Sequence, residues 1–71
     1  MENIVEQILY MCEHDPKTDP HTTFAAALLE TTAERVTASE RHIAKRFFMH
    51  LVMLDCTLAY RWGIIVGRTE K

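Results

Sequence analysis

Apolar residues recur at helical spacing along almost the whole chain, and polar interruptions divide it into three segments. In residues 2–13 the aliphatic residues fall on one side of a helix and the acidic residues on the other, which predicts an amphipathic helix. Residues 14–19 form a run of turn-forming residues around Pro16, and this run predicts the linker after the first helix.

A second helix is expected over residues 20–36. Asp19 directly before Pro20 has the pattern of an N-cap followed by proline at the first helical position. The apolar residues that follow keep a helical period, so the linker is expected to lead straight into this helix.

A long third helix is expected over residues 38–66. Thr37 and Glu40 have the spacing of a capping box, which marks its start. No stretch alternates with the period of two that a β-strand shows. The sequence therefore predicts an all-α, single-domain protein in which two shorter helices pack on one long C-terminal helix.

The long helix carries two apolar faces when it is read at about 100° per residue. The first face is a continuous stripe, expected to meet the two shorter helices; its members are Ile43, Phe47, Leu51, Leu54, Leu58, Trp62 and Ile65. The second face is expected to pair with another copy in a symmetric homodimer, or to meet another protein. Its predicted interface residues are Phe48, Met49, Val52, Met53, Cys56 and Tyr60.

The remaining polar positions of this helix form a basic strip of Arg46, His50 and Arg61, expected to contact water or an acidic partner. Asp55 lies apart from this strip, between the two apolar faces, and has no partner within its own helix. A buried carboxylate without a partner is unfavourable. Asp55 is therefore a solvated boundary residue, one half of a pair across helices or subunits, or a catalytic acid.

Residues 32–47 resemble a helix-turn-helix motif, with small residues, a serine near the start of the second helix and Ile43 at a buried position. The resemblance implies that the second helix reads DNA. The contacts would come from Arg41, His42, Lys45 and Arg46. Two departures count against it: Thr37 stands where glycine is usual, and the second helix continues far beyond the motif.

The run of residues 47–66 has about the length of a membrane-spanning helix. Asp55 and Arg61 interrupt it, and each would cost about 2.5 to 3.5 kcal/mol at the centre of a bilayer. A single membrane span remains an alternative, and a helix covered by protein is the better interpretation.

Composition bounds the remaining functions. The chain has 71 residues, of which 48% are hydrophobic and 25% charged, and a net charge of −2, so it is expected to fold but carries no overall basic signal for nucleic acid. The two cysteines are expected to be free thiols in a cytoplasmic protein. The four histidines lack the spacing of zinc ligands, and no nucleophile motif or phosphate-binding glycine loop occurs.

No metal, cofactor or enzymatic activity is therefore expected. The sequence predicts a small helical protein-interaction module, homodimeric, that binds and modulates another protein, as a phage or mobile-element accessory factor would. A DNA-binding regulator is the first alternative, and a single-span membrane protein is the second.

Overall fold

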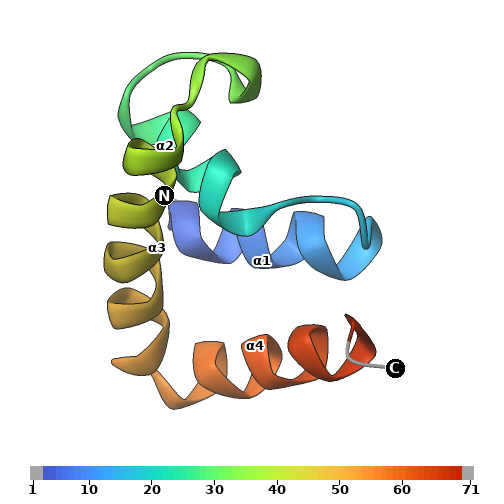
Figure 1. Ribbon diagram of the computed structural model, residues 1–71. Helices are drawn as coiled ribbons and strands as arrows, with labels where there is room; N and C mark the ends of the chain where they lie inside the picture. Colours follow the sequence, from blue (N-terminus) through green and yellow to red (C-terminus); the bar gives the residue numbers. More distant parts are fainter. Residues whose placement is uncertain (1–2, 70–71) are drawn as a thin grey trace.

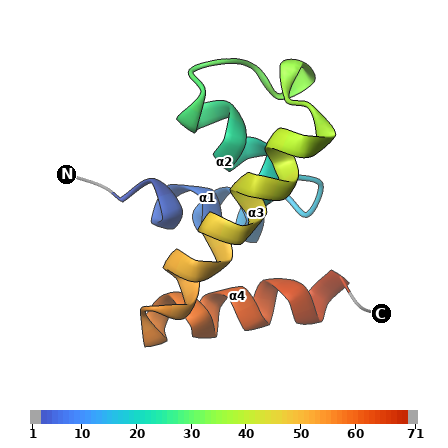
Figure 2. The same ribbon diagram turned by 60° about the vertical axis from the view of Figure 1, so that its left-hand side comes forward.

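The computed structural model describes residues 3–69 and is all-helical, as predicted. Its elements are α1 (Ile4–His14), α2 (Pro20–Leu28), the short 3-10 helix η1 (Ala33–Arg35), α3 (Ala38–Met53) and α4 (Cys56–Thr69). Helices α1 and α4 lie side by side, extend from the same side of α3 and run in the same direction, while α2 packs on α1 and α3 (Figures 1 and 2).

Helix α1 forms where the sequence predicts it. The side chain of Asn3 accepts a hydrogen bond from the backbone N–H of Val5 at 2.8 Å, which satisfies one of the unpaired donors of the first turn. Its buried side carries Val5, Ile8, Leu9 and Cys12, and its other side is largely exposed. The helix ends at His14, and the linker around Pro16 follows.

Helix α2 starts as predicted but is much shorter. Asp19 caps it and Pro20 is its first residue, yet it ends at Leu28, so the expected helix over residues 20–36 is wrong in its second half. The end is a Schellman motif: Glu30 adopts φ 53°, and the Thr31 N–H donates to the Ala26 carbonyl at 2.9 Å. The β-branched Thr31 and Thr32 that follow are poor helix formers, which favours the stop.

The capping box at the start of α3 is confirmed. The Glu40 N–H donates to the Thr37 hydroxyl at 3.1 Å, and the Thr37 N–H donates to the Glu40 carboxylate at 2.9 Å. The predicted single helix over residues 38–66 is wrong, because the chain turns sharply after Met53 and begins α4 at Cys56 (Figure 1).

Asp55 marks this break. Its Oδ1 accepts hydrogen bonds from the backbone N–H groups of Thr57 at 2.8 Å and Leu58 at 3.2 Å, so it caps the start of α4. The group that the sequence left without a partner is thus satisfied by backbone donors two and three residues later. Asp55 is exposed, so its carboxylate also remains hydrated.

The core has Phe48 and Val52 at its centre, both 0% exposed. Rings surround Phe48: Phe24 lies 5.4 Å and Trp62 5.6 Å from it between centroids, both edge-on. Ala25 and Ala44 are buried where α2 and α3 pack, and their small side chains let the two helices come close. The face of α3 that the sequence assigned to a second copy is therefore the face that holds the fold together.

Polar bonds tie α4 to the end of α1. Arg61 forms a two-pronged ion pair with Glu13, with distances of 2.8 and 3.0 Å, and Arg68 donates to the carbonyls of Cys12 and Glu13 at 2.8 and 3.0 Å. These carbonyls belong to the last turn of α1, where no further helical N–H reaches them. The apolar side of α4, with Leu58 and Ile65 buried, lies beneath α1.

Candidate functional site

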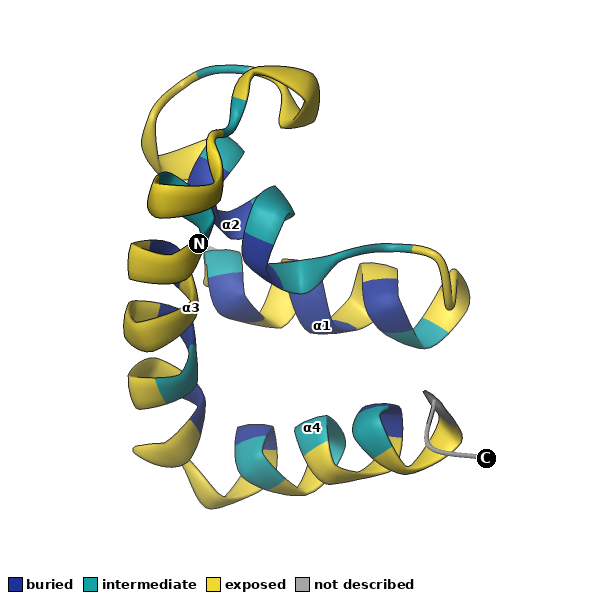
Figure 3. Cartoon of the chain, viewed as in Figure 1, coloured by how far each residue is buried: buried dark blue, intermediate teal, exposed yellow. Residues whose placement is uncertain are grey.

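The largest group of exposed apolar side chains lies on α2 and α3, on the side of α3 that faces away from α1 and α4. Figure 3 shows the outer side of α3 exposed along its whole length. We call this group the α2–α3 apolar face. Its members and their exposed fractions are Leu28 54%, Leu29 50%, Ile43 56%, Phe47 60%, Leu51 40% and Leu54 71%.

Four of these residues belong to the stripe that the sequence placed against the shorter helices, so that assignment is wrong for the part of the stripe in α3. Its continuation in α4 is placed correctly, since Leu58 and Ile65 are buried and Trp62 is half-buried. The helix break separates the two halves, and α3 presents its other side to the core.

Shallow hollows surround Phe47 on this face. One, of about 180 Å³, lies between α2 and α3 and includes Leu28, Leu29 and Ile43 in its lining. A second, of about 320 Å³, includes Phe24, Leu28 and Leu51. Phe47 lines both, so its ring stands at the centre of an apolar groove between the two helices.

Charged residues border the groove unevenly. Arg46 and His50 lie along one rim, where they line a hollow together with Ile43 and Phe47. Both are exposed, and neither has a hydrogen bond or ion pair within residues 3–69. Glu40 lies at the opposite end of the groove, and its carboxylate is already engaged in the capping box.

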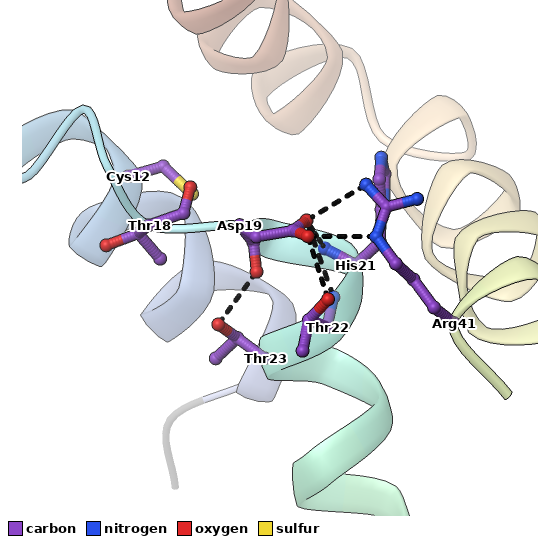
Figure 4. A network of polar contacts seen from close by, with 7 residues as sticks. All are labelled: Cys12, Thr18, Asp19, His21, Thr22, Thr23 and Arg41. Carbon is purple, nitrogen blue, oxygen red and sulfur yellow. Dashed lines mark hydrogen bonds and ion pairs between the residues drawn. The ribbon is translucent and has the colours of Figure 1, made fainter. Parts of the chain in front are cut away.

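A group of polar side chains lies at the start of α2, and we call it the polar junction: Asp19, His21, Thr22 and Arg41 (Figure 4). Asp19 receives two guanidinium hydrogen bonds from Arg41, at 2.8 and 3.2 Å. It also accepts from the Thr22 hydroxyl at 2.8 Å and the His21 N–H at 3.1 Å. One carboxylate thus caps α2 and ties it to α3.

Asp19 remains ionised well into the acid range. Burial alone would raise its pKa, but the hydrogen bonds from Arg41 and Thr22, together with the charge of Arg41, outweigh burial and lower the pKa of Asp19 to about 2. The charges of the junction are therefore satisfied by one another, and they point to a structural role.

His21 is the exception within the junction. It is 8% exposed, and its ring lies edge-on to Phe48 at 5.7 Å and tilted against Trp62 at 5.8 Å. Its Nδ1 is the one buried side-chain nitrogen or oxygen of the described residues that has no hydrogen-bond partner. Burial lowers the pKa of His21, and the nearby positive charge of Arg41 adds to the effect, so the neutral form is favoured.

The predicted interface residues separate into two groups. Phe48 and Val52 are fully buried within the chain and cannot form the surface that the sequence assigned to them. Met49 is half-buried, whereas Met53, Cys56 and Tyr60 are exposed near and beyond the helix break. The sequence prediction did not include Leu28 and Leu29 in the site, because it placed them inside a longer helix. The polar residues 30–32 directly after them are the signal that could have indicated the end of the helix.

The basic strip does not persist as one surface. Arg46 and His50 remain exposed on α3, while Arg61 on α4 is occupied by Glu13. On one straight helix, Arg46, His50 and Arg61 would lie on the same side. The helix break turns α4 away from the axis of α3, so Arg61 points elsewhere.

The helix-turn-helix expectation is not met. Residues 33–35 form a single 3-10 turn rather than the end of a first helix. Of the four residues predicted to contact DNA, His42, Lys45 and Arg46 are exposed, but Arg41 is held by Asp19. The run of residues 47–66 is split between α3 and α4, and among the described helices none is long and apolar enough to cross a membrane.

Reactive groups are scattered over the described part of the chain. Residues 3–69 contain no group of three or more His, Cys, Asp or Glu side chains that could hold a metal ion. Both cysteines are free: Cys56 is exposed, and burial raises the pKa of the Cys12 thiol, which disfavours its reactive thiolate. The predictions that the protein has no metal, cofactor or enzymatic activity stay predictions.

Comparison with protein-family models, with curated proteins and with solved structures finds no match. Within the described residues, the charges of the polar junction are paired with one another, whereas the α2–α3 apolar face is exposed.

Proposed function

We propose that the protein is a non-enzymatic interaction module that docks another protein on its α2–α3 apolar face and thereby modulates it. The observation that supports this is the exposure of six large apolar side chains on one side of a chain of 71 residues. Contiguous apolar surface on a small protein is typical of interaction sites.

The shape of the face supports the same proposal. Phe47 stands 60% exposed at the centre of a groove, with leucines from two helices around it. An aromatic anchor within an apolar ring is the usual arrangement of an interface hot spot. Full burial of one such side chain contributes about 1.5 to 3 kcal/mol. These six are already partly covered, so a partner gains only part of that from each, and the group acts together.

Homodimerisation is a separate proposal and can use only the exposed part of the interface first predicted. Phe48 and Val52 are buried, so any dimer through that region depends on Met53, Cys56 and Tyr60 near the helix break. Light scattering of the wild type measures it: a dimer that Tyr60→Glu converts to monomer supports this proposal, and a monomeric wild type contradicts it.

A comparison of captured proteins tests the main proposal. The purified chain is immobilised and exposed to a lysate of the cells that encode it, alongside Phe47→Ser and the matched control Tyr10→Ser. Phe47 and Tyr10 are 60% and 59% exposed, so both changes remove an aromatic side chain from the surface. Retention of a protein by the wild type and Tyr10→Ser, and its loss with Phe47→Ser, supports the proposal. Identical sets on the wild type and Phe47→Ser contradict it.

A further inference from the structure

We propose that the α2–α3 apolar face binds an amphipathic helix that carries acidic residues along one flank. This inference rests on the proposed function, because it names the chemistry of the partner that docks there. It depends on the length of the groove and on the sign of the charges along its rim.

The groove has the dimensions of a helix-binding site. On α3 the exposed apolar residues Ile43, Phe47, Leu51 and Leu54 follow one another at intervals of four, four and three. At 1.5 Å per residue this stripe is about 17 Å long. Leu28 and Leu29 on α2 form the second wall. Two apolar walls, with Phe47 of the α3 wall lining both hollows between them, fit the apolar side of a helix of about three to four turns.

The rim determines the charge of that helix. Among the residues that line the three hollows the only carboxylate is Glu40, which is engaged in the capping box. The cations from residue 41 to residue 54 are Arg41, Lys45 and Arg46. Arg41 is neutralised by Asp19, whereas Arg46 has no partner within the described residues and lies beside Phe47 and Ile43. His50 extends the same rim. A docked helix therefore gains most if Asp or Glu lies along this side.

The same rim disfavours a second copy as the occupant. When two copies pack their α3 stripes antiparallel about a two-fold axis, each rim meets its own counterpart. With the axis at the middle of the stripe, Arg46 of one copy comes closest to His50 of the second copy, and neither rim offers a carboxylate to the other. A separate helix with carboxylates instead meets this rim with opposite charge.

Three synthetic helical peptides of about 14 residues provide the probe. They share the same leucines at i, i+4, i+7 and i+11 and differ only in the flanking residues, which are Glu, Gln or Lys. Fluorescence anisotropy with the full chain is expected to give about three- to tenfold tighter binding for the Glu peptide than for the Gln peptide, and weaker binding for the Lys peptide. In 1 M salt this preference should shrink, because the Debye length falls to about 3 Å.

Two charge reversals on α3 sharpen the test. Arg46→Glu is expected to reverse the preference towards the Lys peptide. Lys45→Glu makes the same charge change one residue away, at a position about 160° around the helix from Phe47, and should leave the preference nearly unchanged.

The outcomes separate this inference from the proposed function. If the three peptides bind equally, or if the preference for the Glu peptide survives Arg46→Glu, the bound helix does not need acidic residues. Docking on the α2–α3 apolar face is not affected by that result. Binding of no peptide overturns the inference, and a dimeric wild type that Phe47→Ser makes monomeric assigns the groove to a second copy. If Phe47→Ser and Tyr10→Ser instead retain the same proteins from the lysate, the proposed function itself is wrong.

Discussion

The α2–α3 apolar face and the polar junction lie on the same two helices but differ in how their groups are satisfied. At the junction, Asp19 bonds Arg41, Thr22 and the backbone of His21 within a few ångströms. On the apolar face, Phe47 and the leucines around it remain 40 to 71% exposed. The junction fixes how α2 and α3 sit, and that fixed geometry holds the two walls of the open groove in place.

Under the proposed function, the chemically conspicuous residues hold the fold, and the apolar residues meet the partner. The junction contains an ion pair, a buried histidine and a perturbed carboxylate, which are typical of active sites. Its charges are nevertheless mutually satisfied, and its role is to hold two helices together. The less conspicuous aliphatic groove is the region that still lacks a partner.

The largest expected effect comes from two neighbouring phenylalanines. Phe48→Ala should lower the free energy of unfolding by about 3 to 5 kcal/mol, because it leaves a cavity at the centre of the core. Phe47→Ala should change it by less than about 1 kcal/mol, because that ring is 60% exposed. Urea denaturation measures both. Equal losses, or the reverse order, would overturn the assignment of the two faces of α3.

The second effect concerns Asp19. Asp19→Ala removes the cap of α2 and the ion pair with Arg41, and should lower the free energy of unfolding by about 1 to 2 kcal/mol. Asp19→Asn keeps a side chain that can cap the helix but removes the charge, so it should lose less. Thermal melting of both variants at neutral pH checks the order. A larger loss for Asn than for Ala would contradict the capping role.

The same carboxylate makes the free energy of unfolding depend on pH in the acid range. The pKa of Asp19 is about 2 in the folded chain, below its ordinary value, so its charge favours folding above about pH 4. That contribution is lost as the pH falls from about 4 towards 2. Melting temperatures of the wild type should fall more steeply in this window than those of Asp19→Asn, which has no carboxylate to titrate at this position.

His21 should act at milder pH. Burial lowers its pKa in the folded chain, so below its unfolded pKa of about 6.5 the unfolded chain binds more protons and stability falls as the pH decreases. His21→Phe cannot titrate and should remove this part of the decline between about pH 6.5 and 5. Melting temperatures across that range measure it, and an unchanged slope in His21→Phe would show that another group causes it.

The sequence predicts where helices begin better than where they end or which of their faces is buried. The start of α2 at Asp19 and Pro20 and the capping box of Thr37 are local patterns, and both are confirmed. The helix break at Asp55 was missed because no glycine or proline marks it and the apolar period continues across it. Periodicity identifies that α3 has two apolar faces, but which face meets the core depends on the direction from which α1 and α2 approach.

That limit also explains the errors at the candidate site. Phe47 and Phe48 are adjacent, aromatic and equally compatible with a helix, and only tertiary packing makes one exposed and the other buried. Leu28 and Leu29 became part of the site because α2 stops at Leu28. They are exposed because Glu30, Thr31 and Thr32 end the helix there. These residues include no glycine or proline, which are the usual signs of a helix end in a sequence.

The smallest expected effect lies at this stop, beside the open groove. Glu30 adopts φ 53°, a left-handed conformation in which side chains other than glycine are disfavoured. Glu30→Gly should relieve this strain and raise the free energy of unfolding by about 0.5 kcal/mol, since the greater entropy of glycine in the unfolded chain offsets part of the gain. Glu30→Ala keeps a Cβ and should not stabilise the chain. If Ala stabilises as much as Gly, loss of the negative charge rather than relief of backbone strain is the cause.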